Sequence, residues 1–546
     1  MNEDNAWLLV ASLALPLAML IAGLVPGWRR HLSAWLVVAP LPALAAALLV
    51  VEAPPLVLDE AGLKIGLALD QPGALLLGVA ALLWSAAGAY AWRYLRGDSS
   101  EGRFVVYWLL SLTGCLGVFL AADLVSFYLF FGLVSLAAYG LVVHDGTPRA
   151  RHAAVVYIAL AVFGEACLLL AFVLLAAATP GESLLIRDVV AALPSSPLRD
   201  QTLAFLLLGF GLKAGLLPLH LWLPLAHPAA PMPASAVLSG AIIKTGLFGL
   251  MIFLPFGAEL PGWAWGLTTV GLVTALYGAL IGLFQANPKT VLAYSSISQM
   301  GVATAILGMG LALGEAAAVL VAAFYAAHHV LVKGALFLAV GVVAATGRRR
   351  LWPVLLPTAV LALGLGGLPL TGGFLAKLVA KPWLDEGLVG LVATLSAVAT
   401  TMLMVHFLRR LLANLAVEPM NRAPLGLILP WAGLAVAALF VPWVLYARVL
   451  AAADPTEVLT MAYLLAAAGP VLAGLALGLI LVRWGNRLPP IPEGDVGVWG
   501  ERAVRATFAW GRPLARLDAV LRQWPAAGLA LLTLALLLGL SMLGGP

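Results

Sequence analysis

The chain has 546 residues, of which 63% are hydrophobic and only 10% charged, with a formal net charge of +5. A soluble domain could not bury so much apolar surface, so this composition excludes an ordinary soluble protein and indicates a helical membrane protein. Two cysteines provide neither a disulfide framework nor a paired-cysteine metal motif. The positive charge lies in short loops beside apolar runs, which is a topology signal and argues against nucleic-acid binding.

Runs of about 17–25 apolar residues are long enough to cross a bilayer as helices. In chain order, we expect such runs at residues 6–26, 33–52, 71–95, 105–121, 124–143, 153–178, 202–218, 234–255, 263–285, 291–313, 316–345, 353–380, 388–412, 424–447, 459–482 and 525–543. The first lacks a small-residue cleavage site, so we interpret it as a retained span. The sequence therefore predicts an all-α polytopic membrane protein with about 14–16 transmembrane helices.

Basic loops fall on alternate connections between the expected spans. Loops that contain Arg96, Arg149 and Lys289 belong to this set, whereas the opposite set is acidic, as at Asp385-Glu386. Since cytoplasmic loops carry an excess of Lys and Arg, the basic set predicts the cytoplasmic side of a multi-pass protein in the inner (plasma) membrane. A polar stretch at about residues 488–524 has helical spacing, and we expect it to lie on the cytoplasmic interface or to dock to a partner subunit.

Two expected spans are interrupted by glycine and proline. The seventh contains Gly211-Leu-Lys213-Ala-Gly-Leu-Leu-Pro218, and the twelfth contains Gly364-Leu-Gly-Gly-Leu-Pro369 followed by Lys377. Broken helices five spans apart suggest two repeated five-helix units, an arrangement that places ion sites at mid-membrane. We divide the chain into N-terminal helices at 1–104, repeats at 105–255 and 263–412, and C-terminal helices at 424–546.

The charges inside the apolar spans are lysines and not arginines. The chain has 23 arginines, all expected in loops or at helix ends, but four of its seven lysines fall within spans: Lys213, Lys244, Lys333 and Lys377. Each charge at a helix centre costs about 2.5–3.5 kcal/mol, so each needs a reason. A desolvated lysine can release its proton, whereas arginine stays charged. Glu165 is the one carboxylate deep in a span, and this set predicts a proton relay.

Histidines extend this row of lysines. His329 is four residues before Lys333, so the two share a helix face and form a plausible proton-transfer pair. The adjacent His328 is a second candidate for relay or gating. His220 and His227 flank the loop after the first broken helix, and for them both hydrogen-bonded packing and a relay role stay open.

These segments resemble the antiporter-like subunits of respiratory complex I, Mrp-type cation antiporters and membrane-bound hydrogenases. The resemblance extends over about residues 105–410, and residues 149–165 look closest to the hydrogenase-4 type subunit. Its motifs are Lys213-Ala-Gly-Leu-Leu-Pro218, His220-Leu-Trp-Leu-Pro-Leu-Ala-His227, Asn287-Pro-Lys-Thr-Val-Leu-Ala-Tyr-Ser-Ser-Ile-Ser-Gln-Met-Gly301 and His329-Val-Leu-Val-Lys333.

The resemblance implies two inverted five-helix repeats, each with a discontinuous helix. It implies that Lys213 is the proton carrier of the first half-channel and that Lys377 is the terminal charged residue of the second. Lys244, His329 and Lys333 match relay positions in a central hydrophilic axis.

One position departs from the family pattern. The family usually pairs the first lysine with a glutamate on the fifth span, but this chain reads Leu129-Phe-Phe-Gly132 there. Glu165 on the next span matches a site where some relatives carry an acid, and it could substitute. Alternatively, the coupling is altered and the subunit has lost full pumping.

We therefore expect a proton-translocating subunit of a larger complex in the bilayer, with sodium as the alternative ion. No motif for NADH, flavin, iron–sulfur or another cofactor is present, so the driving reaction should belong to other membrane and cytoplasmic subunits of a translocase. The alternatives are a subunit that couples ion flow to a cytoplasmic partner, such as an inorganic-carbon uptake protein, and a non-pumping scaffold. A further alternative, a carrier for a large organic solute, is disfavoured because the expected spans have no arginine and no acid besides Glu165 at mid-membrane to bind such a solute.

Overall fold

The computed structural model describes residues 5–29, 31–52, 54–60, 63–449, 457–484, 491–494 and 498. The chain divides into two compact units, Met1–Glu493 and Gly494–Pro546, and the fold below is that of the first. The predicted segment at 488–524, apart from 491–494 and 498, and the last predicted span at 525–543 lie outside the described residues.

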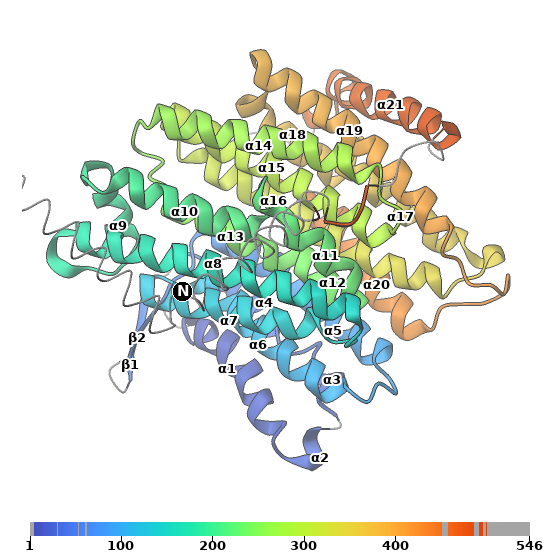
Figure 1. Ribbon diagram of the computed structural model, residues 1–546, viewed down its shortest axis with the longest axis horizontal. Helices are drawn as coiled ribbons and strands as arrows, with labels where there is room; N and C mark the ends of the chain where they lie inside the picture. The colour runs from blue at the N-terminus through green and yellow to red at the C-terminus, as the bar shows by residue number, and fades with distance from the viewer. Residues whose placement is uncertain are drawn as a thin grey trace, which may run out of the picture. The chain divides into compact units, whose positions relative to one another are not determined.

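The first unit is a bundle of long α-helices (Figure 1). In the described part, twelve helical segments are long and apolar enough to cross a membrane, which confirms a polytopic all-α membrane protein. Ten of them are α5 (Gln71–Tyr94), α6 (Glu101–Leu120), α7 (Leu124–Val142), α8 (Pro148–Ala178), α14 (Pro261–Gly282), α15 (Pro288–Leu313), α16 (Ala317–Ala344), α19 (Gly387–Leu412), α20 (Leu425–Val449) and α21 (Met461–Trp484).

Two further spans are composite. One joins α10 (Arg199–Ala214) to α11 (Trp222–Ala229), and the other joins α12 (Met232–Val237) to α13 (Ile243–Phe253) through a π-helical turn at Leu238–Ile242. Two other apolar helices are shorter than these spans: α1 (Trp7–Ala22) and α17 (Trp352–Gly366).

The N-terminal region differs from the expectation in one place. The run expected to span the membrane at 33–52 forms two short helices, α3 (Leu32–Trp35) and α4 (Leu41–Leu49), separated by a turn. Pro40 lacks the N–H that a continuous helix would require at that position, so hydropathy alone overestimated the length of this helix. The remaining short elements are α2 (Pro26–Arg29), a hairpin of β1 (Leu56–Glu60) and β2 (Leu63–Leu67), and α9 (Ile186–Ala192).

Both predicted helix breaks are present, and each first half ends at a glycine with a left-handed backbone. Gly215 has φ +74° after α10, and Gly367 has φ +102° after α17. Only glycine adopts this conformation without steric cost, so it is a common helix terminator. The second half of the later break is α18 (Gly372–Leu384).

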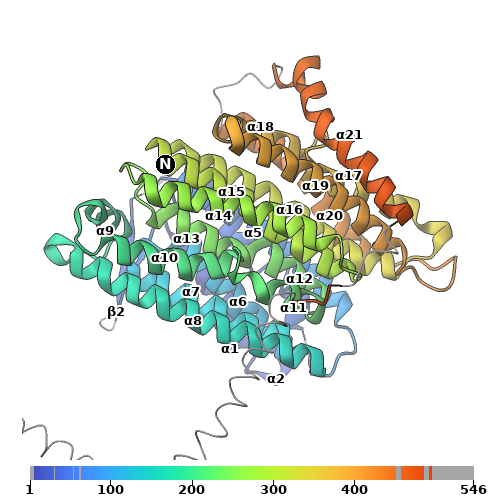
Figure 2. The ribbon, with the colours of Figure 1, turned by 45° about the horizontal axis from the view of Figure 1, so that its top comes forward.

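The packing around the two breaks is repeated. α6 packs on α7 as α14 packs on α15, and α8 packs on α11 as α16 packs on α18. Figure 2 shows α8 and α10 side by side, with α14 and α15 above them. Each block contains five spans, an odd number, so consecutive blocks enter the membrane from opposite sides and the repeats are inverted. The exact boundaries given above for the four parts of the chain stay a prediction.

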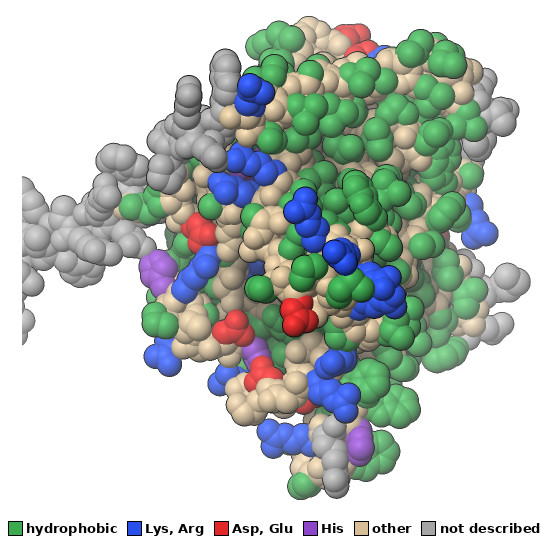
Figure 3. Space-filling view, turned by 90° about the vertical axis from the view of Figure 1, so that its right-hand side faces the viewer, with side chains coloured by type: hydrophobic (Ala, Val, Ile, Leu, Met, Phe, Trp, Pro, Cys, Tyr) green, Lys and Arg blue, Asp and Glu red, His purple; other side chains and the backbone are tan. Residues whose placement is uncertain are grey.

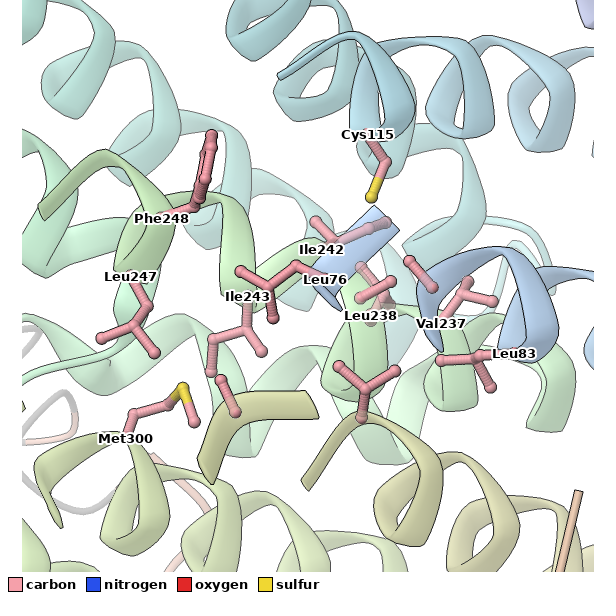
Figure 4. Packing of buried hydrophobic residues seen from close by; sticks show 14 of the residues in the cluster. Leu76, Leu83, Cys115, Val237, Leu238, Ile242, Ile243, Leu247, Phe248 and Met300 are labelled. Carbon is pink, nitrogen blue, oxygen red and sulfur yellow. The ribbon is translucent and has the colours of Figure 1, made fainter. Parts of the chain in front are cut away.

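The middle of the bundle is closely packed with apolar side chains. Around the π-helical turn, Leu238 and Ile242 are buried among Leu76 and Leu83 of α5 and Cys115 of α6 (Figure 4). Such packing leaves little room for water, so polar side chains in this layer must find partners in the protein. On the face that Figure 3 shows, basic side chains gather beside a few acidic ones and histidines.

Candidate functional site

The first buried lysine is held by two hydroxyl groups. Lys213 lies in the last turn of α10 with 3% of its side chain exposed. Its Nζ donates to Ser135 Oγ at 2.8 Å and to the Tyr157 hydroxyl at 3.3 Å. The Tyr157 hydroxyl in turn donates to the Ser135 carbonyl at 2.9 Å, which leaves its oxygen to accept from the lysine. α7, α8 and α10 therefore build this site together.

The carboxylate of Glu165 lies next to the position where a glutamate was expected. A Cβ atom placed on Gly132 would have one neighbour within 4 Å, which is Glu165 Oε2 at 3.8 Å. Gly132 is three residues before Ser135 on α7, so the two share the helix face that meets Lys213. Neither carboxylate oxygen of Glu165 has a hydrogen-bond partner among the described residues. The acid from α8 thus reaches the space left beside Gly132.

The centre of the bundle contains a lysine–histidine contact. Lys244 Nζ lies 2.5 Å from His329 Nδ1 and donates to the Ser239 carbonyl at 2.7 Å. Ser239 belongs to the π-helical turn, where the helical hydrogen bonds run from i to i+5 and the backbone pattern is altered. Lys244 and His329 are both fully buried, and they come from the first and the second repeat respectively.

Serine hydroxyls extend this contact to the next lysine. Lys333, one turn after His329 on α16, donates to the Leu292 carbonyl at 2.9 Å. The same carbonyl accepts from Ser296 at 3.1 Å, and the Ser296 and Ser239 hydroxyl oxygens are 2.7 Å apart. Lys333 and Lys244 are thus linked through Leu292, Ser296 and Ser239, although Lys244 contacts the Ser239 carbonyl and Ser296 contacts the Ser239 hydroxyl.

The last predicted lysine lies in a different environment. Lys377, on α18, lines a cavity of about 330 Å³ between α18, α19 and α21. Tyr325 lines the same cavity, and its hydroxyl donates to Gln299 Oε1 at 2.6 Å. His328 lies against the start of α18, with Nε2 3.0 Å from a Cβ placed on Gly373. Neither ring nitrogen of His328 is hydrogen-bonded within the described ranges.

The two remaining histidines are both buried near the first break. The ring of His220 packs edge-on against Tyr277, with centroids 5.2 Å apart. His227 lies on α11 against Phe337 at 4.9 Å, and in the part of the chain that the structure describes neither of its ring nitrogens has a hydrogen-bond partner. The charges of Lys244, Lys289 and Lys333 all act on the His227 ring.

Several polar residues of this site were not predicted. Ser135, Tyr157, Ser239 and Ser296 are common residue types, and only their position inside apolar spans could have marked them. Lys289 was assigned to an exposed basic loop, but it lies in the first turn of α15 with 6% exposure, and its Nζ donates to the Ala230 carbonyl. α15 begins at Pro288, one residue before Lys289, so this lysine belongs to the helix and points into the bundle. Across the residues described, no group of three or more His, Cys, Asp or Glu could hold a metal ion.

Residues 121–404 match the family described as NADH:quinone oxidoreductase/Mrp antiporter, TM. The Na(+)/H(+) antiporter subunit A1 of Staphylococcus haemolyticus is 33% identical over 313 residues, which are 53% of this chain and 39% of that protein. Its counterpart in Staphylococcus aureus is 31% identical over 341 residues, 58% of this chain and 42% of that protein. The matched region thus spans well under half the length of these relatives.

Two solved structures share the fold. A chain of the Mrp complex from Dietzia sp. DQ12-45-1b has a TM-score of 0.75 at 24% identity, and the match covers 99% of this chain and 63% of that chain. A chain of the membrane-bound sulfane sulfur reductase, an archaeal respiratory membrane complex, has a TM-score of 0.70 at 21% identity, with coverage of 97% and 99%.

Proposed function

Because this multi-pass membrane protein belongs to the NADH:quinone oxidoreductase/Mrp antiporter family, we propose that it translocates protons along the buried row of Glu165, Lys213, Lys244, His329, Lys333 and Lys377. The histidines His220, His227 and His328 lie beside this row and are further candidates for relay or gating. The chain acts as one subunit of a larger membrane complex.

The contact between Lys244 and His329 carries the proposal. An amine 2.5 Å from an imidazole nitrogen is within the distance at which a proton can pass directly. The contact also joins the two repeats, so a proton can continue toward Lys333 and the second break. Amine and imidazole nitrogens bind protons, whereas hard metal cations prefer oxygen ligands. The row therefore favours protons over sodium as the ion inside this chain.

The driving reaction belongs to other subunits. The similar proteins are named as antiporter subunits, and the similar structures are of a complex or a reductase with several chains. We propose that this chain likewise assembles with other membrane subunits and with cytoplasmic ones. A redox reaction or a sodium gradient in those partners would drive the proton row, and a cytoplasmic partner that consumes the ion flow is the alternative.

The position of Glu165 favours transport over a scaffold that has lost its ion path. A scaffold would have no reason to retain an acid beside the space at Gly132 and within electrostatic reach of Lys213. Glu165 thus takes the place of the glutamate that the family usually has on the fifth span.

Proton uptake in energised vesicles tests the function. The vesicles contain the chain with its own partner subunits, and wild type is compared with Lys213→Ala. We expect a loss of about 100-fold, the usual effect of removing a positioned proton carrier. Lys64→Ala is the matched control, because Lys64 lies in strand β2 of the hairpin, outside the helices that carry the row. Normal uptake by Lys213→Ala at equal protein level would overturn the proposal.

A further inference from the structure

Lys289 occupies a position that does not suit a permanently charged side chain. It lies in the first turn of α15, where the positive end of the helix dipole repels cations. It is also buried, although a lysine at a helix end can usually extend its amine to water. Its amine donates to a backbone carbonyl, that of Ala230. A purely structural contact of this kind does not require a basic group.

His227 lies close to the carbonyl that Lys289 contacts, because the Ser235 hydroxyl contacts the carbonyl oxygens of both His227 and Ala230, at 2.9 and 3.2 Å. The fully buried ring of His227 packs against Phe337, which lies on α16 one turn after Lys333. Since no described residue bonds to either ring nitrogen, both can exchange a proton with a neighbour. Imidazole can accept a proton at one nitrogen and release one from the other, so His227 has the chemistry of a bridge.

Lys289 itself is buried, but charged groups at the surface lie near the start of α15. The acid whose charge acts on Lys289 is Asp145, an exposed residue in the loop between α7 and α8. The charge of Arg149 acts on Lys289 as well, but Arg149 forms an ion pair with Glu493. Glu493 also accepts from Thr290 Oγ1 at 2.8 Å, which holds residues 491–493 over the start of α15. An exposed acid, and an arginine whose charge is already paired with a carboxylate, thus lie near the start of α15.

We propose that Asp145, Lys289 and His227 form the entrance through which protons pass from the arginine-rich end of the bundle to Lys333 and Lys244. A proton leaves the Lys289 ammonium for one ring nitrogen of neutral His227. The other ring nitrogen then releases a proton to the neutral amine of Lys333 or Lys244. Lys289 takes its replacement from water at Asp145. This inference rests on the proposed function, because an entrance has a meaning only if the central row conducts.

Lys289→Arg separates this role from a structural one. Arginine keeps the positive charge and can donate to the Ala230 carbonyl, but it does not release its proton. In energised vesicles with the complete assembly, we expect proton uptake by Lys289→Arg to fall at least about tenfold. Lys64→Arg, in strand β2 of the hairpin, is the matched control and should keep wild-type uptake.

A second variant covers the case in which the larger arginine prevents folding. His227→Phe keeps an aromatic ring against Phe337 but removes both nitrogens, and we expect the same loss of uptake at normal protein level. If both variants retain uptake within twofold while Lys213→Ala loses it, the entrance is wrong and the proposed function stands. If Lys213→Ala also retains uptake, the proposed function itself fails.

Discussion

The two broken helices place their lysines on opposite sides of the break. Lys213 lies in α10 just before its break and is bonded to Ser135 and Tyr157 in a closed environment. Lys377 lies in α18 after its break, and among the described residues it has no hydrogen-bond or ion-pair partner and lines a cavity instead. One repeat architecture thus produces one lysine held by hydrogen bonds and one that lines a cavity.

This difference assigns different tasks to the two halves. Proton transfer through Lys213 depends on the positions of three side chains, because its amine is held by Ser135 and Tyr157. Transfer at Lys377 can be assisted by water in the cavity, since a space of about 330 Å³ is large enough for several water molecules. We therefore expect the first half to be sensitive to small chemical changes and the second half to be more tolerant.

The largest expected effect comes from arginine at the two lysines. Lys213→Arg should lower proton uptake about 100-fold, because arginine stays charged and the site is built from hydrogen bonds to an amine. Lys377→Arg should lower it only about tenfold, because water in the cavity carries part of the flow. Initial uptake rates in vesicles, normalised to the amount of protein, measure both. Equal losses would remove the distinction between a closed and an open half.

An exchange of the acid between α8 and α7 should have an intermediate effect. Glu165→Gln alone should lower uptake about tenfold. Adding Gly132→Glu should restore most of the rate, because the new side chain would start 3.8 Å from the old carboxylate. The same rate measurement compares the single and the double variant. If Glu165→Gln has wild-type uptake, the carboxylate near Gly132 has no part in the path.

The smallest expected effect concerns the glycines that end α10 and α17. Gly215→Ala and Gly367→Ala should each lower the free energy of unfolding by about 1 kcal/mol, because both positions have positive φ. They should differ in function, since a Cβ on Gly367 would lie 2.9 Å from Lys377 Cδ, whereas one on Gly215 meets Leu223. Thermal unfolding in detergent and uptake per molecule separate the two effects. Reduced uptake by Gly215→Ala alone would contradict this assignment.

The sequence predicted which charged residues lie inside the bundle better than it predicted their hydrogen-bond partners. The breaks near Lys213 and Lys377 were predictable because glycine and proline interrupt a helix locally. Lysines inside apolar runs are also easy to recognise in the sequence. The burial of Lys289 was not predictable, because a shift of a few residues in the start of α15 decides whether its side chain is in a loop or in the bundle. Ser135 and Tyr157 became partners of Lys213 only through packing between α7, α8 and α10.

The π-helical turn before Lys244 has a consequence for insertions and deletions. A π-helical turn contains one residue more than an α-helical turn, so deletion of one residue within Leu238–Ile242 should restore a regular helix. The extra residue is taken up within the π-helical turn itself, so the deletion would leave Lys244 at nearly the same angle about the helix axis. A residue inserted between this turn and Lys244 would instead rotate the rest of the helix by about 100° and turn Lys244 away from His329. The aim of the central lysine is therefore encoded by the number of residues between it and this turn as well as by their identity.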